Sequence, residues 1–181
     1  MQTTDFHFFY ETKRLILRPV KIEDAEFYFH LMNSPKWLQF IGDRELRNLK
    51  ETELYIQQKM LLDWKKNGYG SFTVLLQEDL TMIGTCGLFV REGLNGVDLG
   101  FALLSEYEGQ GYAYEAASRI KDAAFNEFHL QELFAITLPE NKVSQKLLKK
   151  LGFQSVGTTT LPGDEQEVLL LKAYPTGLPS T

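Results

Sequence analysis

The sequence of 181 residues is poor in the side chains and segments on which several classes of protein depend. Its single cysteine, Cys86, cannot form an internal disulfide, and one cysteine with three scattered histidines gives no pattern of metal ligands. No apolar run approaches the roughly eighteen residues of a membrane-spanning helix, and the N-terminus lacks the segments of a signal peptide. The net charge of −5 argues against a nucleic-acid-binding protein. We therefore expect a metal-free cytoplasmic protein with neither a membrane nor nucleic acid as partner.

The composition, with 44% hydrophobic and 24% charged residues, is that of a globular protein. The length, and the absence of repeats, low-complexity tracts and linkers, favour a single domain over residues 1–181. The periodicity of apolar residues predicts an α+β fold with the order βααβββαβαββ. The expected strands are 14–19, 71–77, 82–91, 97–104, 133–138, 154–160 and 167–173, and the expected helices are 22–32, 48–66, 111–128 and 141–151.

The most informative segment is 98–117, where an apolar strand leads through a Gly-X-Gly turn into a helix. Gly109 and Gly111 allow a tight turn, and the helix that begins at Tyr112 presents N–H groups without intrahelical partners, as a pyrophosphate site requires. The turn is not a P-loop, because no Lys-Ser/Thr pair follows it, nor a dinucleotide fingerprint, because Glu132 begins a strand instead of ending one. Taken alone, the two glycines fit a phosphate site and a plain turn equally.

A second motif lies downstream, where Pro139 ends a strand and Asn141 is expected to cap a helix that stops at Gly152. Together, a strand, a glycine turn onto a helix, a strand and then Asn-x-x-Ser-(x)6-Leu-Gly-Phe resemble the GNAT superfamily of acyl-CoA-dependent N-acetyltransferases. The segment ETKRLILRPVKIEDAEFYFHLMNSP is similar to the start of the branch that contains the ribosomal-protein N-terminal acetyltransferases. The resemblance extends over residues 12–174, nearly the whole chain.

This resemblance implies a GNAT-like mixed, mostly antiparallel sheet flanked by helices, and acetyl-CoA as cosubstrate. It also implies acetyl transfer by direct attack of a primary amine within a ternary complex. The acceptor that it implies is a protein N-terminal α-amine or a small-molecule amine, and we expect a monomer or a homodimer.

The resemblance further assigns the cofactor-binding segments. Main-chain amides of one strand would bind the pantetheine arm and the thioester, the glycine turn would bind the pyrophosphate, and Asn141 would both cap its helix and hold the pantetheine. The cofactor-binding residues expected in this way are Phe101, Ala102, Leu103, Glu108, Gly109, Gln110, Gly111, Tyr112, Ala113, Asn141 and Ser144. Glu108 departs from the family pattern, and because a carboxylate near a diphosphate is unfavourable, we expect its side chain to face solvent.

Two residues are candidates for catalysis. Asp98 stands where relatives have an acid that deprotonates the amine, and the alternative is a charged residue that simply begins a strand. Ser144 is the candidate proton donor to the leaving thiolate, because Leu148 stands where many relatives have a tyrosine. In the alternative, the Ser144 hydroxyl bonds back to a helix carbonyl.

Other assignments stay open. Trp37 and Phe40 either shape the acceptor site or pack in the core, and the aromatic segment 6–10 either packs on the sheet or forms a dimer contact. Four lysines lie on a solvated helix face, or one or two of them meet the phosphates of CoA: Lys142, Lys146, Lys149 and Lys150. A non-catalytic acyl-CoA-binding sensor or assembly module is the alternative to an enzyme.

Overall fold

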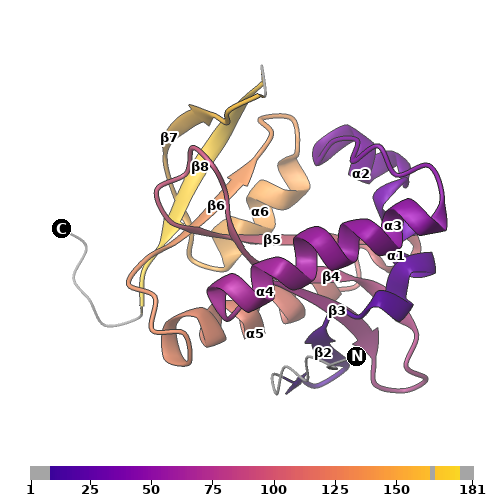
Figure 1. The fold of residues 1–181 in the computed structure, drawn as a ribbon. Helices are drawn as coiled ribbons and strands as arrows, with labels where there is room; N and C mark the ends of the chain where they lie inside the picture. Colours follow the sequence, from indigo (N-terminus) through magenta and orange to yellow (C-terminus); the bar gives the residue numbers. More distant parts are fainter. Residues whose placement is uncertain (1–8, 164–165, 176–181) are drawn as a thin grey trace.

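The computed structural model describes residues 9–163 and 166–175, whose eight strands form one sheet with the order β1-β2-β3-β4-β5-β6-β8-β7 (Figure 1). Neighbouring strands are antiparallel except for β5 and β6, which are parallel. The expected α+β class and mixed, mostly antiparallel sheet are confirmed. The strands are β1 (Tyr10–Glu11), β2 (Leu15–Pro19), β3 (Ser71–Leu76), β4 (Met82–Val90), β5 (Val97–Leu103), β6 (Leu133–Thr137), β7 (Gln154–Thr160) and β8 (Glu167–Ala173).

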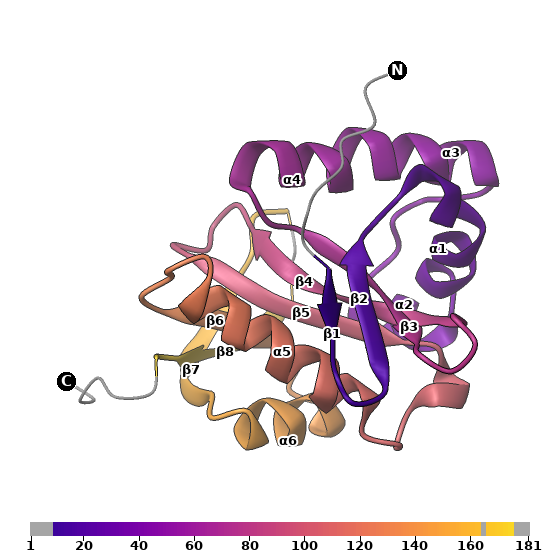
Figure 2. The same ribbon diagram turned by 90° about the horizontal axis from the view of Figure 1, so that it is seen from below.

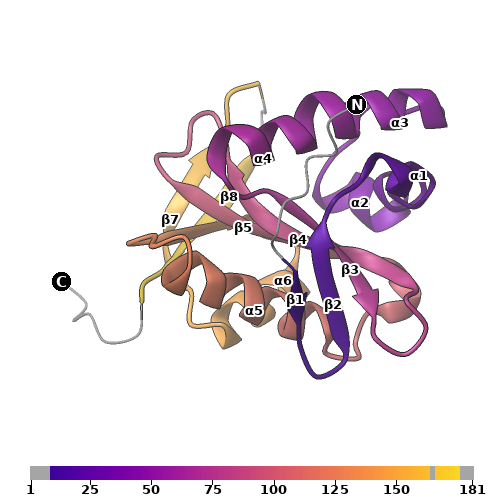
Figure 3. The ribbon, with the colours of Figure 1, turned by 60° about the horizontal axis from the view of Figure 1, so that its bottom comes forward.

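The helices are α1 (Ala25–Met32), α2 (Pro35–Phe40), α3 (Leu49–Tyr55), α4 (Leu61–Asn67), α5 (Tyr112–Asn126) and α6 (Lys142–Lys150). Figures 2 and 3 show α3 and α4 above one face of the sheet, with α1 and α2 beside them, and α5 and α6 against the other face. Within the described part of the chain, no helix is both long and apolar enough to cross a membrane.

The predicted order of elements is confirmed, with three short additions: β1, α2 and a 3-10 helix, Ser105–Tyr107. No helix is expected from the sequence between residues 32 and 48, but Pro35 begins α2 there. The reason is that proline lacks the N–H that a first helical residue leaves unpaired, and its fixed φ suits that position. The expected helix 48–66 is interrupted by a π-helical turn, Ile56–Met60, between α3 and α4. Of the aromatic segment 6–10, residues 6–8 lie outside the described residues, and Tyr10 packs on Phe72 with ring centroids 5.3 Å apart.

A buried polar network fixes α1 to the sheet. The Arg18 guanidinium donates two hydrogen bonds of 2.7 Å to the Asp24 carboxylate, which also accepts a 2.8 Å bond from the Thr73 hydroxyl. From α1, the buried Tyr28 hydroxyl lies 3.3 Å from the Thr73 hydroxyl and donates to Thr85 at 3.1 Å. Since buried polar groups cost little only when they are paired, this network specifies how α1 lies across β2, β3 and β4.

The strands β4 and β5 approach closely at Gly84. A Cβ atom at this position would lie 2.3 Å from Leu103 Cδ2 and 2.4 Å from the carbonyl oxygen of Ala102. We therefore expect Gly84→Ala to push β5 away from β4 and to lower the free energy of unfolding by about 1–3 kcal/mol. Urea denaturation will show a lower midpoint with an unchanged slope if this is correct. A wild-type midpoint would contradict the close approach.

Candidate cofactor and acceptor site

The sheet opens between β5 and β6. β5 pairs with β4 along its whole length, from Val97 to Leu103, but its register with β6 consists of one pair, Asp98 with Phe134. Beyond Asp98 the two parallel strands diverge, and β6 continues its pairing with β8 on the other side. Among the described strands, none satisfies the backbone donors and acceptors on this edge of β5 beyond Asp98. Such an edge is a suitable binding site for an extended ligand with amide groups.

The register shows which residues face this open edge. The Leu104 N–H donates to the Ile83 carbonyl at 2.9 Å, and in an antiparallel ladder hydrogen-bonded and non-hydrogen-bonded pairs alternate. Ala102 and its partner Thr85 are then a hydrogen-bonded pair, so the Ala102 amide points to β4. The expectation that Ala102 contributes its amide to the cofactor site is therefore wrong. Phe101 and Leu103, by the same alternation, direct their backbone groups to the opening.

The glycine turn has the predicted conformation. Gly109 and Gly111 have φ values of 73° and 85°, in the left-handed region that favours glycine. Gly111 is the N-terminal cap of the 15-residue helix α5, whose first backbone bond runs from the Glu115 N–H to the Gly111 carbonyl at 3.0 Å. Among the residues that the structure describes, the N–H groups of Gly111 and of residues 112–114 consequently have no backbone partner. They lie at the positive end of the helix dipole.

Glu108 does not simply face solvent. Its carboxylate forms an ion pair with Lys36 of α2, and its side chain is 31% exposed. The expectation that this side chain turns into solvent missed a cation that lies 72 positions earlier in the sequence. The pair removes the unfavourable charge beside the glycine turn and places α2 next to that turn.

Helix α6 begins as predicted. The Asn141 side chain accepts a 3.0 Å hydrogen bond from the Ser144 N–H, which makes Asn141 the N-cap. The Ser144 hydroxyl makes no bond to a helix carbonyl within the described residues, so the alternative interpretation of this serine finds no support. Leu148, one turn further along the same helix face, is 0% exposed and packs in the core.

Asp98 lies at the base of the opening. It is 1% exposed, and its carboxylate accepts a 2.7 Å hydrogen bond from Arg91 Nε. Burial raises the pKa of Asp98 above its ordinary value, while the charge and hydrogen bond of Arg91 lower it. On the same strand face, a Cβ at Gly100 would meet the Phe89 ring at 2.9 Å and Arg91 Nη2 at 3.8 Å. Arg91 and Phe89 therefore cover the face of β5 that carries Asp98.

Of the two residues expected to shape the acceptor site, Trp37 of α2 is 8% exposed and Phe40 is half-buried. The Trp37 indole N–H is buried and has no hydrogen-bond partner in the described part of the chain. Trp37 belongs to the buried core, and both residues lie on the helix that Lys36 ties to the glycine turn. Of the four lysines on α6, Lys150 places its ammonium 4.1 Å from the centre of the Tyr114 ring.

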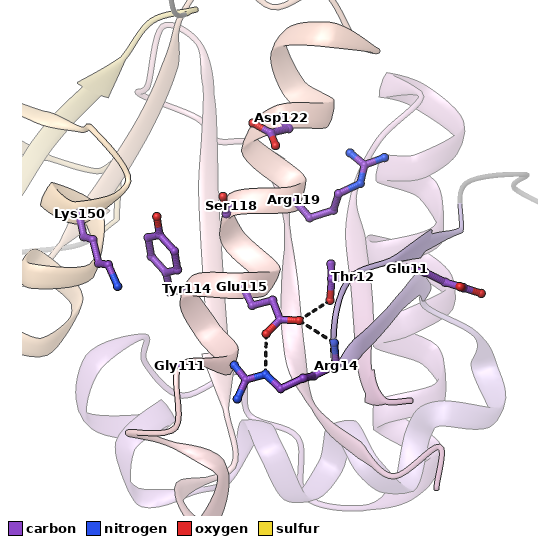
Figure 4. A pocket seen from close by; sticks show the side chains of 10 residues that line it. All are labelled: Glu11, Thr12, Arg14, Gly111, Tyr114, Glu115, Ser118, Arg119, Asp122 and Lys150. Carbon is purple, nitrogen blue, oxygen red and sulfur yellow. Dashed lines mark hydrogen bonds and ion pairs between the residues drawn. The ribbon is translucent and has the colours of Figure 1, made fainter. Parts of the chain in front are cut away.

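An open pocket of about 600 Å³ lies along α5 beside the glycine turn. Figure 4 shows the side chains that line it. It is lined by Glu11, Thr12, Arg14, Gly111, Tyr114, Glu115, Ser118, Arg119, Asp122 and Lys150. Sequence reasoning missed Arg14 and Glu115, which meet here from positions 101 residues apart, and no local pattern connects them. Among residues 9–163 and 166–175, no group of three or more His, Cys, Asp or Glu side chains could hold a metal ion.

Comparisons with known proteins identify the family. Residues 14–154 match the acetyltransferase (GNAT) domain. The chain is 30% identical over 148 residues to the uncharacterized N-acetyltransferase p20 of Bacillus licheniformis, covering 81% of this chain and 82% of that protein. The chain therefore belongs to the GNAT acetyltransferase family, and it is an acyltransferase.

Solved structures have the same fold. An acetyltransferase from Agrobacterium tumefaciens superposes with a TM-score of 0.77 at 27% identity, covering 92% of this chain and 94% of that one. RimL, a ribosomal L7/L12 α-N-protein acetyltransferase in complex with coenzyme A, superposes with a TM-score of 0.75 at 18% identity, covering 92% and 98%. At this low identity, the second likeness shows the fold alone.

The glycine turn gives a direct test of the phosphate site. Valine tolerates a φ of 85° poorly, so Gly111→Val should displace the N–H groups at the start of α5 and weaken acetyl-CoA binding at least tenfold, roughly the effect of one charge-assisted hydrogen bond. The matched control is Gly68→Val, which has a similar φ of 78° at the end of α4 and open space around it. Calorimetry should show wild-type affinity for the control. Wild-type affinity in folded Gly111→Val would rule out this turn as the phosphate site.

Proposed function

We propose that the protein is an acetyl-CoA-dependent N-acetyltransferase that transfers the acetyl group to a primary amine by direct attack in a ternary complex. The observation that carries the proposal is the open edge of β5, which leads through the 3-10 helix Ser105–Tyr107 into the glycine turn at the start of α5. An extended arm with amide groups, a thioester at one end and a diphosphate at the other, is the ligand that such an edge and turn would accept together.

In this proposal the backbone groups of Phe101 and Leu103 bind the pantetheine arm and the thioester carbonyl. The diphosphate is bound by the unpartnered N–H groups from Gly111 to Tyr114, with Gly109 and Gln110 shaping the turn. Support comes from the unpaired state of these groups and from the coenzyme A complex of RimL, which shares the fold. Donors fixed before the reaction stabilise the negative charge that develops on the thioester oxygen.

Two side chains have proposed catalytic roles. Ser144, in the first turn of α6 and with its hydroxyl unbonded to any helix carbonyl within the described residues, donates a proton to the departing thiolate. Asp98 accepts the proton of the amine through a bridging water molecule, because its own carboxylate is almost completely buried. A base is most effective when its pKa lies near the working pH, and burial moves the pKa of Asp98 upward in that direction.

The acceptor is a protein N-terminal α-amine or a small-molecule amine, bound beside α2, with Trp37 and Phe40 at its edge. An α-amine has an ordinary pKa of about 8, against about 10.4 for a lysine side chain, so it is more often neutral and reactive. One buried carboxylate and no tyrosine at position 148 offer little further help with deprotonation. Amines of low pKa are therefore the preferred acceptors.

Two observations favour a second function. Leu148, at the position where many relatives have a catalytic tyrosine, is a buried apolar residue, and the Asp98 carboxylate is already bound by Arg91 in an ion pair. Both observations favour an acyl-CoA-binding sensor or assembly module that holds the thioester without turnover. Calorimetry with acetyl-CoA tests the shared property of binding, and release of CoA thiol in the presence of an amine panel separates the enzyme from the sensor. Tight binding with no thiol release from any amine would support the sensor.

The proton donor can be tested by removing one oxygen atom. Ser144→Ala should lower kcat by about a hundredfold, because a positioned acid contributes this much. The Asn141 cap, which uses the backbone N–H of residue 144, should remain, and the affinity for acetyl-CoA should change by no more than a few-fold. Thiol release at saturating acetyl-CoA gives the rate and calorimetry gives the affinity. An unchanged kcat would exclude Ser144 as the acid.

The base can be tested by the pH dependence of turnover. If ionised Asp98 accepts the proton, kcat rises with pH as Asp98 loses its own proton, and Asp98→Asn removes this limb. Arg91 lowers the pKa of Asp98, so Arg91→Gln should move the limb to higher pH. The same limb in wild type and in Asp98→Asn would show that another group is responsible.

Acceptor preference requires two peptides of otherwise identical sequence. One has a free N-terminus and no lysine, and the other has a blocked N-terminus and one internal lysine. We expect the first peptide to be acetylated faster. At equal intrinsic reactivity the ratio of rates equals the ratio of the fractions of neutral amine, which is more than about a hundredfold. Faster reaction of the lysine peptide would contradict the preference, and reaction with neither would leave small-molecule amines as the acceptors.

A further inference from the structure

The glycine turn is held from outside by residues that precede it by about a hundred positions. Arg14 Nη1 donates to the Gln110 carbonyl at 3.0 Å, and Arg14 Nε donates to Glu115 Oε2 at 2.7 Å. The other Glu115 oxygen accepts bonds from the Arg14 backbone N–H at 2.8 Å and from the Thr12 hydroxyl at 2.7 Å. The Arg14 guanidinium also lies over the Tyr112 ring, 4.3 Å from its centre. Figure 4 shows the contacts of Thr12 and Arg14 with Glu115.

The bond to Gln110 fixes the direction of one N–H group. In a trans peptide the carbonyl and the following N–H point in opposite directions. Since Arg14 holds the Gln110 carbonyl on its own side, the Gly111 N–H of the same peptide unit must point away from Arg14. Within the described residues this N–H donates to no other group, so it is free for a ligand on that side.

The same contacts neutralise the negative charge of the Glu115 carboxylate. Glu115 lies in the first turn of α5, where a carboxylate would compete with a bound anion for the helix dipole. Burial raises the pKa of the Glu115 carboxyl, but the hydrogen bonds from Thr12 and Arg14 and the charge of Arg14 outweigh burial and hold its pKa below the ordinary value. Glu115 is therefore ionised, and its oxygens are occupied by Thr12 and Arg14.

We propose that Arg14 and Glu115 are positioning residues for the diphosphate of acetyl-CoA: Glu115 orients the Arg14 guanidinium, and Arg14 directs the Gly111 N–H to the diphosphate. This inference rests on the proposed function, because it requires that the turn binds a diphosphate. It adds Arg14, from the loop between β1 and β2, to a site that is otherwise built from β5, α5 and α6.

A second ion pair on α5 provides an internal comparison. Arg119 and Glu127 are 2.7 Å apart, the Arg119 guanidinium lies 3.8 Å from the centre of the Tyr10 ring, and the Tyr10 hydroxyl donates to Glu127 at 2.9 Å. This pair also ties the N-terminal hairpin to α5, with the same side-chain chemistry, but it lies beyond the first turns of the helix. Its loss should affect stability without affecting the diphosphate.

The test compares two ligands and matched variants. Calorimetry measures the Kd of CoA, which carries the diphosphate. NMR titration of ¹⁵N-labelled protein, a method suited to weak binding, measures the Kd of pantetheine, which lacks the diphosphate. For Glu115→Gln we expect at least about tenfold weaker CoA binding, the effect of losing a charge-assisted hydrogen bond, with the Kd of pantetheine within twofold of wild type. For Glu127→Gln both constants should stay at wild-type values.

Arg14→Lys is the second variant, for use if Glu115→Gln does not fold. A lysine ammonium can reach Glu115 but lacks the fork that reaches Gln110 at the same time, so CoA binding should again weaken while pantetheine binding does not. Wild-type CoA affinity in the folded variants would overturn the proposal, and equal weakening of both ligands would overturn it too, because that is the result of general structural damage. Failure of the wild-type protein to bind CoA would instead contradict the proposed function.

Discussion

The site depends on the divergence of two parallel strands. β5 and β6 share one register pair, Asp98 with Phe134, and then separate, although both remain fully paired on their other sides. Two strands that stayed paired would consume the backbone groups of Phe101 and Leu103 in the ladder, and no edge would be left for a ligand. The close approach of β4 to β5 at Gly84 holds β5 on its other edge, so the opening is a fixed part of the sheet.

Three acidic side chains around the opening are paired with cations. Glu108 meets Lys36, Glu115 meets Arg14, and Asp98 meets Arg91. An anionic ligand at the start of α5 would be repelled by unpaired carboxylates at these positions, since Coulomb interactions at a few ångströms are strong wherever water is partly excluded. The protein has a net charge of −5, yet with these three carboxylates paired, the glycine turn presents a helix dipole and N–H donors that have no backbone partner in the described part of the chain.

The sequence was sufficient for the order of the main elements, for the left-handed glycines at 109 and 111, and for Asn141 as the cap of α6. These features depend on local periodicity and on residue types with strong conformational preferences. Which backbone groups of β5 point to the opening was not predictable in the same way. Whether the N–H of Phe101, Ala102 or Leu103 points to the opening or to β4 depends on the register with β4, and a shift of one residue would reverse the directions. The pairs Lys36–Glu108 and Arg14–Glu115 join segments 72 and 101 positions apart, and no local pattern identifies such contacts.

The central claim is that the open edge of β5 binds the pantetheine arm, and amide hydrogen exchange at single-residue resolution tests it most directly. In the free protein the Ala102 amide, which pairs with β4, should exchange slowly, and the amides of Phe101 and Leu103 should exchange faster. Adding CoA should slow exchange at Phe101 and Leu103 and leave Ala102 nearly unchanged. Unchanged exchange at Phe101 and Leu103 in protein saturated with CoA would contradict the account.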